Sequence, residues 1–223
     1  MRPALLALAC TLALPATAQD CATDAMLVFD GSASMAEIGL DDTVSRIVEA
    51  RAAMARILPE VEDVRRIGLL TYGPGPENSC EGLRLRFPPM DRAAARALAE
   101  LDTLDPNGMT PLTEAVEMAA EAMEYRTRPA IVVLVTDGNE TCGGRPCALS
   151  TRLAEQAADL TIHVIGYRAN ADFFAWDNPE QEFGEASVTR CLSDATGGVF
   201  IGAETEDALV DALRRTLGCL VIG

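Results

Sequence analysis

The sequence predicts an α/β fold, a three-layer sandwich in which a mostly parallel six-stranded sheet with one antiparallel edge strand carries helices on both faces. Short apolar runs of strand length alternate along the chain with segments whose apolar residues have helical spacing. Residues 130–135 form an unbroken apolar run, which is typical of a strand buried on both faces. Residues 82–87 alternate with period two, which predicts the edge strand.

The expected elements follow one another in the order that this fold needs. We expect strands at residues 25–30, 66–73, 82–87, 130–138, 161–167 and 198–203. We expect helices at residues 43–58, 91–104, 110–125, 148–160, 186–195 and 204–219. Pro59 should help to stop the first helix, while Asp91 and Thr110 should cap the second and third. Because no repeat or linker interrupts the pattern, residues 19–223 are predicted to form one domain.

Residues 1–18 have the layout of a secretory signal peptide. A short positive start precedes the apolar run of residues 4–14, and small residues stand before an expected cut at Gln19. The alternative is a membrane anchor, but the apolar run is about half of the ~20 residues that span a bilayer. We therefore expect a periplasmic or secreted protein.

Composition disfavours several classes of function. The net charge is −16, which opposes binding to nucleic acid or anionic lipid and suits a cation site. The chain has no Lys, so it lacks a P-loop lysine and a Schiff-base lysine. Its single histidine, His163, lies in an apolar run and is expected to be a buried, hydrogen-bonded structural residue. We therefore predict that the protein is not an enzyme.

Three segments at expected strand ends or helix starts carry oxygen ligands. Asp30, Ser32 and Ser34 follow the first strand, Thr110 begins a helix, and Asp137 ends the buried strand. Ligand sites in such sheets form beyond the carboxyl ends of the strands. Carboxylate and hydroxyl oxygens suit hard cations such as Mg²⁺, Mn²⁺ or Ca²⁺. Taken alone, the DGSAS segment could instead be a Gly/Ser turn in which Asp30 caps a helix.

With these three segments, the chain resembles the von Willebrand factor A-type domains, whose metal-ion-dependent adhesion site combines D-x-S-x-S with a separate Thr and a separate Asp. The resemblance covers roughly residues 22 to 219. It implies that Asp30, Ser32, Ser34 and Thr110 coordinate one divalent metal directly or through water, and that Asp137 acts largely through water. The metal would then bind an Asp or Glu of a protein partner.

Two other functions compete with this metal-dependent binding module. One is a phosphotransferase with Asp30 as nucleophile, although position 32 is Ser and Lys is absent. The other is a structural domain with an inactive metal site. An aromatic segment with Phe173, Phe174 and Trp176 follows the fifth expected strand. It is either a hydrophobic plug or a contact for the partner.

The six cysteines after residue 18 predict disulfides in an oxidising compartment. Cys142 and Cys147 flank a turn-rich stretch and are expected to pair. Cys21 and Cys219 should both lie at the end of the sheet opposite the metal, which favours a second pair. Elimination then leaves Cys80 with Cys191.

Overall fold

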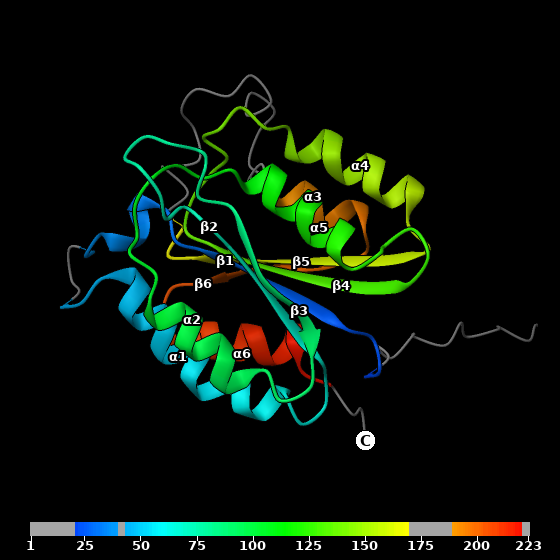
Figure 1. Ribbon diagram of the computed structural model, residues 1–223, viewed down its shortest axis with the longest axis horizontal. Coiled ribbons are helices and arrows are strands. Elements are labelled where there is room, and N and C mark those ends of the chain that lie inside the picture. Colours follow the sequence, from blue (N-terminus) through cyan, green and yellow to red (C-terminus); the bar gives the residue numbers. More distant parts are fainter. Residues whose placement is uncertain (1–20, 40–42, 170–188, 220–223) are drawn as a thin grey trace, which may run out of the picture.

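The computed structural model describes residues 21–39, 43–169 and 189–219. Its centre is a six-stranded sheet with the strand order β3-β2-β1-β4-β5-β6 (Figure 1). β2 and β3 are antiparallel and the other neighbouring strands are parallel, as the sequence predicts. The strands are β1 (Ala25–Asp30), β2 (Ile67–Tyr72), β3 (Arg84–Met90), β4 (Pro129–Thr136), β5 (Asp159–Tyr167) and β6 (Phe200–Ala203).

Helices cover both faces of the sheet, which makes the expected three layers (Figure 1). One face carries α1 (Arg46–Val61), α2 (Ala94–Asp102) and α6 (Glu206–Leu217). The other face carries α3 (Leu112–Ala122), α4 (Pro146–Gln156) and α5 (Arg190–Ala195). A short 3-10 helix, η1 (Ala33–Ala36), lies between β1 and α1.

Strand β1 is central and fully buried because β2 and β4 flank it and both of its faces are covered. Side chains of a strand alternate between the two faces. Leu27 and Phe29 therefore enter the core under α1 and α6, while Met26 and Val28 enter the core under α3. Since β1 and β4 are parallel neighbours, they end at the same edge of the sheet. This register brings the polar residues that follow the two strands together.

The helix boundaries differ from the expectation by a few residues, and two of the differences have a clear physical reason. Helix α1 continues through Pro59 to Val61, because Pro59 and the preceding turn at Ala55 are exposed, so the carbonyl group that loses its partner can bind water. Helix α2 begins at Ala94 rather than after Asp91. Its first turn receives a cap from another helix, since the Ala94 N–H donates to Glu62 Oε2 at 2.8 Å.

His163 is the buried structural residue that the sequence predicts. It is 4% exposed, and its Nδ1 accepts a hydrogen bond from the Val199 N–H at 3.2 Å. Burial, with a smaller effect from the charge of Arg65, lowers the pKa of His163 to about 4. The imidazole is therefore neutral at physiological pH.

The predicted signal peptide, residues 1–18, lies outside the described residues, so it stays a prediction. Among the helices that the structure describes, none is both long enough and apolar enough to cross a bilayer.

Candidate metal centre

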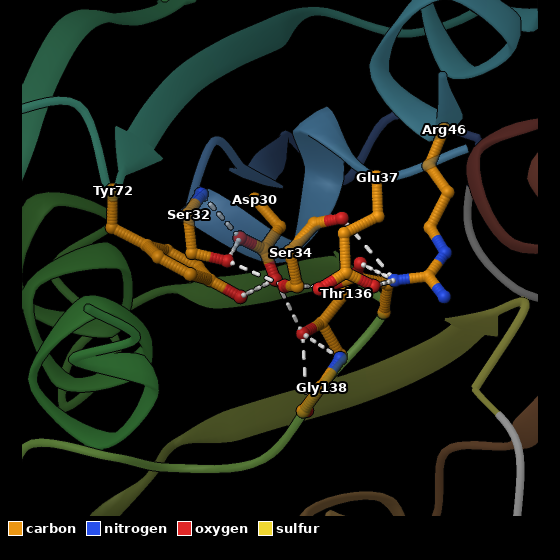
Figure 2. A network of polar contacts seen from close by, with 9 residues as sticks. Asp30, Ser32, Ser34, Glu37, Arg46, Tyr72, Thr136 and Gly138 are labelled. Atoms are coloured by element: carbon orange, nitrogen blue, oxygen red, sulfur yellow. Dashed lines mark hydrogen bonds and ion pairs between the residues drawn. The ribbon is translucent and has the colours of Figure 1, made fainter. Parts of the chain in front are cut away.

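Asp30 is the innermost residue of the site. It ends β1, has no exposed surface, and both of its carboxylate oxygens accept hydrogen bonds. Oδ1 accepts from the Ser32 N–H at 2.8 Å and from the Ser32 hydroxyl at 2.6 Å. Oδ2 accepts from the Tyr72 hydroxyl at 2.9 Å and from the Thr136 hydroxyl at 2.7 Å. Four donors therefore fix the carboxylate in place (Figure 2).

The hydroxyl groups of Ser32 and Ser34 connect Asp30 to Asp137. The two serine Oγ atoms lie 3.2 Å apart, and the Ser34 hydroxyl donates to Asp137 Oδ1 at 2.7 Å. Asp137 follows β4, and its residue is 5% exposed. One continuous chain of oxygen contacts thus joins four of the five predicted ligands, Asp30, Ser32, Ser34 and Asp137.

This chain of contacts has one proton too few. A hydroxyl carries a single proton, and an ionised carboxylate only accepts. The Ser32 proton is donated to Asp30 and the Ser34 proton to Asp137. Above about pH 7, where Asp137 is ionised as well as Asp30, no proton is left for the 3.2 Å contact between the two Oγ atoms. Lone pairs of Ser32 and Ser34 therefore face the same space, which is the arrangement that a cation stabilises.

The spacing of these oxygens also fits a small cation. An octahedral Mg²⁺ with ligands at about 2.0–2.1 Å holds neighbouring oxygens roughly 2.9 Å apart. The three successive contacts from Asp30 Oδ1 to Asp137 Oδ1 measure 2.6, 3.2 and 2.7 Å. Among the described residues, no group of three or more His, Cys, Asp or Glu side chains gathers around one point. A metal held here would accordingly be bound by a site rich in hydroxyl groups.

Thr110 reaches this edge of the sheet through its backbone. It is 5% exposed, its N–H donates to Thr141 Oγ1 at 2.8 Å, and its carbonyl accepts from the Thr141 N–H at 3.1 Å. Just before it, Gly108 accepts from the Ala33 N–H at 3.2 Å through its carbonyl. The structure therefore brings all three predicted segments together, although no hydrogen bond joins the Thr110 hydroxyl to the other four side chains in the part of the chain described.

Thr110 does not cap α3, contrary to the expectation. Helix α3 has Pro111 at the N-cap position and no cap from that side chain. Glu140 supplies the acceptor instead: its Oε2 accepts from the Thr113 N–H and its Oε1 from the Cys142 N–H, each at 2.7 Å. The loop after β4 thus holds the start of α3, which leaves the Thr110 side chain available for another role.

Two glycines allow the loops to approach so closely. Gly73 and Gly108 both have positive φ, at 100° and 68°. A Cβ atom on Gly73 would lie 2.2 Å from the Gly31 carbonyl carbon, and one on Gly108 would lie 2.4 Å from the Gly73 carbonyl oxygen. A side chain at Gly73 would displace the DGSAS loop, and one at Gly108 would displace the loop after β2.

Arg46, which was not predicted from the sequence, contributes the positive charge at this site. Its Nη1 atom donates to Asp137 Oδ2 at 2.9 Å, to the Ser34 carbonyl oxygen at 3.2 Å and to Glu37 Oε2 at 3.1 Å. Burial, followed by the charge of Asp30, raises the pKa of Asp137 to about 7, against the lowering effects of Ser34 and Arg46. The site is therefore an electrostatic balance between two buried carboxylates and one guanidinium.

Tyr72, Thr136 and Arg46 contact the predicted ligands but were not predicted from the sequence. The first two could have been found from strand register, because Tyr72 pairs with Asp30 across β2 and β1, and Thr136 directly precedes Asp137. Burial, and next the charge of Asp30, raises the pKa of Tyr72 well above its ordinary value, so its hydroxyl remains a donor. Arg46 has no such signal, since its contacts depend on how α1 lies against the sheet.

One of the three predicted disulfides is confirmed. Cys21 and Cys219 are bonded, which links the residues before β1 to those after α6 at the end of the sheet away from the site. The other two predicted pairs are wrong. The structure joins Cys80 to Cys142, with Cα atoms 5.9 Å apart, and Cys147 to Cys191, with Cα atoms 5.3 Å apart.

The turn-rich stretch between Cys142 and Cys147 does not bring these two cysteines together. That stretch runs directly into α4, and Cys147 lies in the first turn of the helix. Helix α4 packs beside α5, so Cys147 meets Cys191. Cys142 stays in the loop that Glu140 holds, where it reaches Cys80 in the loop after β2. These two loops also hold the neighbours of Thr110, because the Met109 N–H donates to the Ser79 carbonyl oxygen at 2.9 Å.

The aromatic segment with Phe173, Phe174 and Trp176 lies outside the described residues. The prediction that it contacts a partner therefore stays a prediction.

Comparisons with known proteins agree with this architecture. The family model of the von Willebrand factor type A domain matches residues 25–140, which include all five predicted ligands. YwmD of Bacillus subtilis is 26% identical over 205 residues, covering 86% of this chain and 84% of YwmD. YwmC of the same organism is 27% identical over 150 residues, covering 63% of this chain. The aligned part is 64% of the length of YwmC.

Solved structures share the fold at low sequence identity. The VWA domain of SpRpn10 superposes with a TM-score of 0.63 at 15% identity, covering 90% of this chain and 99% of that domain. Proximal thread matrix protein 1 of the mussel byssus, in a form with a zinc-occupied MIDAS motif, gives a TM-score of 0.58 at 18% identity. That match covers 89% of this chain and 46% of the mussel chain.

Proposed function

We propose that this chain, which belongs to the von Willebrand factor type A domain family, is a metal-dependent protein-binding module. Members of the family are commonly protein-interaction or adhesion modules and are generally not enzymes. Asp30, Ser32, Ser34, Thr110 and Asp137 would hold one divalent cation, Mg²⁺ or else Mn²⁺ or Ca²⁺. The bound cation would supply a positive centre with an open position for a carboxylate of a protein partner.

The observation that carries the proposal is the contact between the Oγ atoms of Ser32 and Ser34. It lies between two hydroxyl groups whose protons are already donated to carboxylates. The oxygen spacings match those of an octahedral cation. The zinc-occupied MIDAS of the mussel protein supports a metal at this position of the fold.

Isothermal titration calorimetry with Mg²⁺ tests the metal. We expect one site per chain in the wild type and none in Ser32→Ala. Ser150→Ala is a matched control, because Ser150 is also buried but donates to a backbone carbonyl group of α4. At a hundredfold excess over the dissociation constant, Mg²⁺ should stabilise the wild type by about 2.7 kcal/mol. A wild type that binds neither Mg²⁺, Mn²⁺ nor Ca²⁺ would contradict the proposal.

The partner is tested by capture from a periplasmic extract in Mg²⁺ and in EDTA. We expect a discrete protein that is retained only with Mg²⁺, by the wild type and Ser150→Ala but not by Ser32→Ala. Retention that is unaffected by EDTA would mean that the metal is not the contact.

The competing phosphotransferase has less support, because members of this family are generally not enzymes. The chain also has no Lys, and position 32 is Ser.

We propose that the protein acts outside the cytoplasm, in the periplasm or after secretion. Three disulfides support this location, because such bonds persist in oxidising compartments. Residues 1–18 would then direct export.

A further inference from the structure

Arg46 is the cation nearest to the two buried carboxylates of the site. It is the first residue of α1, and its side chain is 11% exposed. The Asp137 side chain, with which it forms an ion pair at 2.9 Å, has no exposed surface. Figure 2 shows the Arg46 side chain extending from α1 toward Ser34.

We propose that Arg46 is a built-in counter-ion that stabilises the metal-free site and competes with the incoming metal for Asp137. The inference deepens the function proposed above, since it concerns the same site. It assigns to Arg46 a positioning role that sets how tightly the site binds a cation without a partner.

The first reason is the cost of buried charge. A carboxylate taken out of water without a partner is strongly destabilising. Asp30 avoids this cost through its four hydrogen-bond donors. Asp137 has one hydroxyl donor, Ser34, and otherwise depends on Arg46. The guanidinium therefore neutralises the Asp137 carboxylate in the metal-free protein, as a bound metal would.

The second reason is that Arg46 is placed for exchange. All three of its hydrogen bonds pass through Nη1, while its buried Nε has no hydrogen-bond partner among the described residues. A planar guanidinium can bind a carboxylate through two parallel bonds, but this one does not. Its exposed second partner, Glu37, offers a place to which the charge can shift.

Arg46 also explains why a bound cation would need an acidic ligand. The buried carboxylates of Asp30 and Asp137 and the guanidinium of Arg46 sum to a charge of −1. Glu37, the other acidic partner of Arg46, is left out of this sum because its side chain is 58% exposed and solvent screens its charge. A divalent cation in this site would retain an excess of +1, which a carboxylate of the partner neutralises. Without Arg46 the site alone would neutralise the cation.

The test compares the wild type with Arg46→Gln in mildly alkaline buffer, using Mn²⁺ as the probe. Gln keeps hydrogen-bond donors and removes the charge. The matched control is Arg65→Gln: Arg65 is also buried, but it donates to the Leu217 carbonyl oxygen near the opposite end of the strands. Melting temperatures in EDTA and in Mn²⁺ are measured together with Mn²⁺ affinity by calorimetry.

We expect Arg46→Gln to melt lower than the wild type in EDTA and to bind Mn²⁺ about tenfold more tightly or better, since a unit charge a few ångströms away contributes at least that much. Arg65→Gln should melt lower with unchanged Mn²⁺ affinity. If Arg46→Gln is unfolded in EDTA and folds when Mn²⁺ is added, the inference is also supported. Mn²⁺ affinity that is equal or weaker in Arg46→Gln, or a variant that stays unfolded in Mn²⁺, overturns it.

The two proposals fail separately. If the wild type binds no metal and Arg46→Gln does, the proposed function is wrong and Arg46 is a permanent substitute for the metal. If the wild type binds Mn²⁺ and Arg46→Gln binds it no better, only the role of Arg46 is wrong. If neither binds Mn²⁺, both are wrong.

Discussion

Replacing Tyr72 with Phe removes one hydrogen bond from the Asp30 carboxylate and leaves the aromatic ring in place. The Tyr72 hydroxyl lies 2.9 Å from Asp30 Oδ2, and both residues are fully buried. A hydrogen bond to a charged group contributes about 1.5–3 kcal/mol, against about 0.5–1.5 kcal/mol for a neutral pair. We therefore expect Tyr72→Phe to lower the free energy of unfolding by about 1.5–3 kcal/mol.

Tyr125→Phe is the control, because Tyr125 is equally buried and donates at the same 2.9 Å to the neutral amide oxygen of Gln156. It should cost only about 0.5–1.5 kcal/mol. Urea unfolding in EDTA, with linear extrapolation and unchanged m-values, measures both. If Tyr72→Phe costs no more than Tyr125→Phe, then Asp30 is not a charged acceptor in the metal-free protein. The inference that no proton remains for the contact between Ser32 and Ser34 would then be wrong as well.

Two further predictions concern the disulfides and the buried histidine. Replacing Cys80 and Cys142 with Ala should weaken Mg²⁺ binding, because this bond ties together the loops beside Thr110, the proposed ligand. Replacing Cys21 and Cys219 should lower the melting temperature and leave Mg²⁺ affinity unchanged. Equal effects of the two double variants on the affinity measured by calorimetry would contradict this. The pKa of His163 is lowered from 6.5 in the unfolded chain to about 4 in the folded protein. The neutral imidazole therefore contributes up to about 3 kcal/mol to the free energy of unfolding above pH 6.5, and this contribution is lost as the pH falls toward 4. The difference in unfolding free energy between the wild type and His163→Gln should shrink over that range, and a constant difference would show that the histidine is not held neutral.

The strands were the most predictable part of the fold. The unbroken apolar run of β4 reflects burial on both faces of the strand. The alternating pattern of residues 82–87 correctly predicted that β3 is an edge strand, although Leu85 is 41% exposed. The ends of the helices were less predictable. Glu62 caps α2 from another helix, and no local pattern near Asp91 shows this.

The candidate site divides in the same way. Asp30, Ser32, Ser34 and Asp137 could be placed together because each follows a strand end in a parallel sheet. Arg46 could not, because its contact with Asp137 spans 91 residues and depends on the packing of α1. The pairing of Cys142 failed for a related reason: sequence proximity favoured Cys147, while the tertiary arrangement of two loops favoured Cys80.

The three disulfides enclose the chain without crossing. The bonds Cys80–Cys142 and Cys147–Cys191 close consecutive stretches, and Cys21–Cys219 encloses both. A single proteolytic nick anywhere between the outermost pair therefore leaves one covalent molecule, even after the protein is denatured. On a gel the nicked and the intact oxidised chains have the same mass apart from one water, and the fragments separate only after a thiol is added.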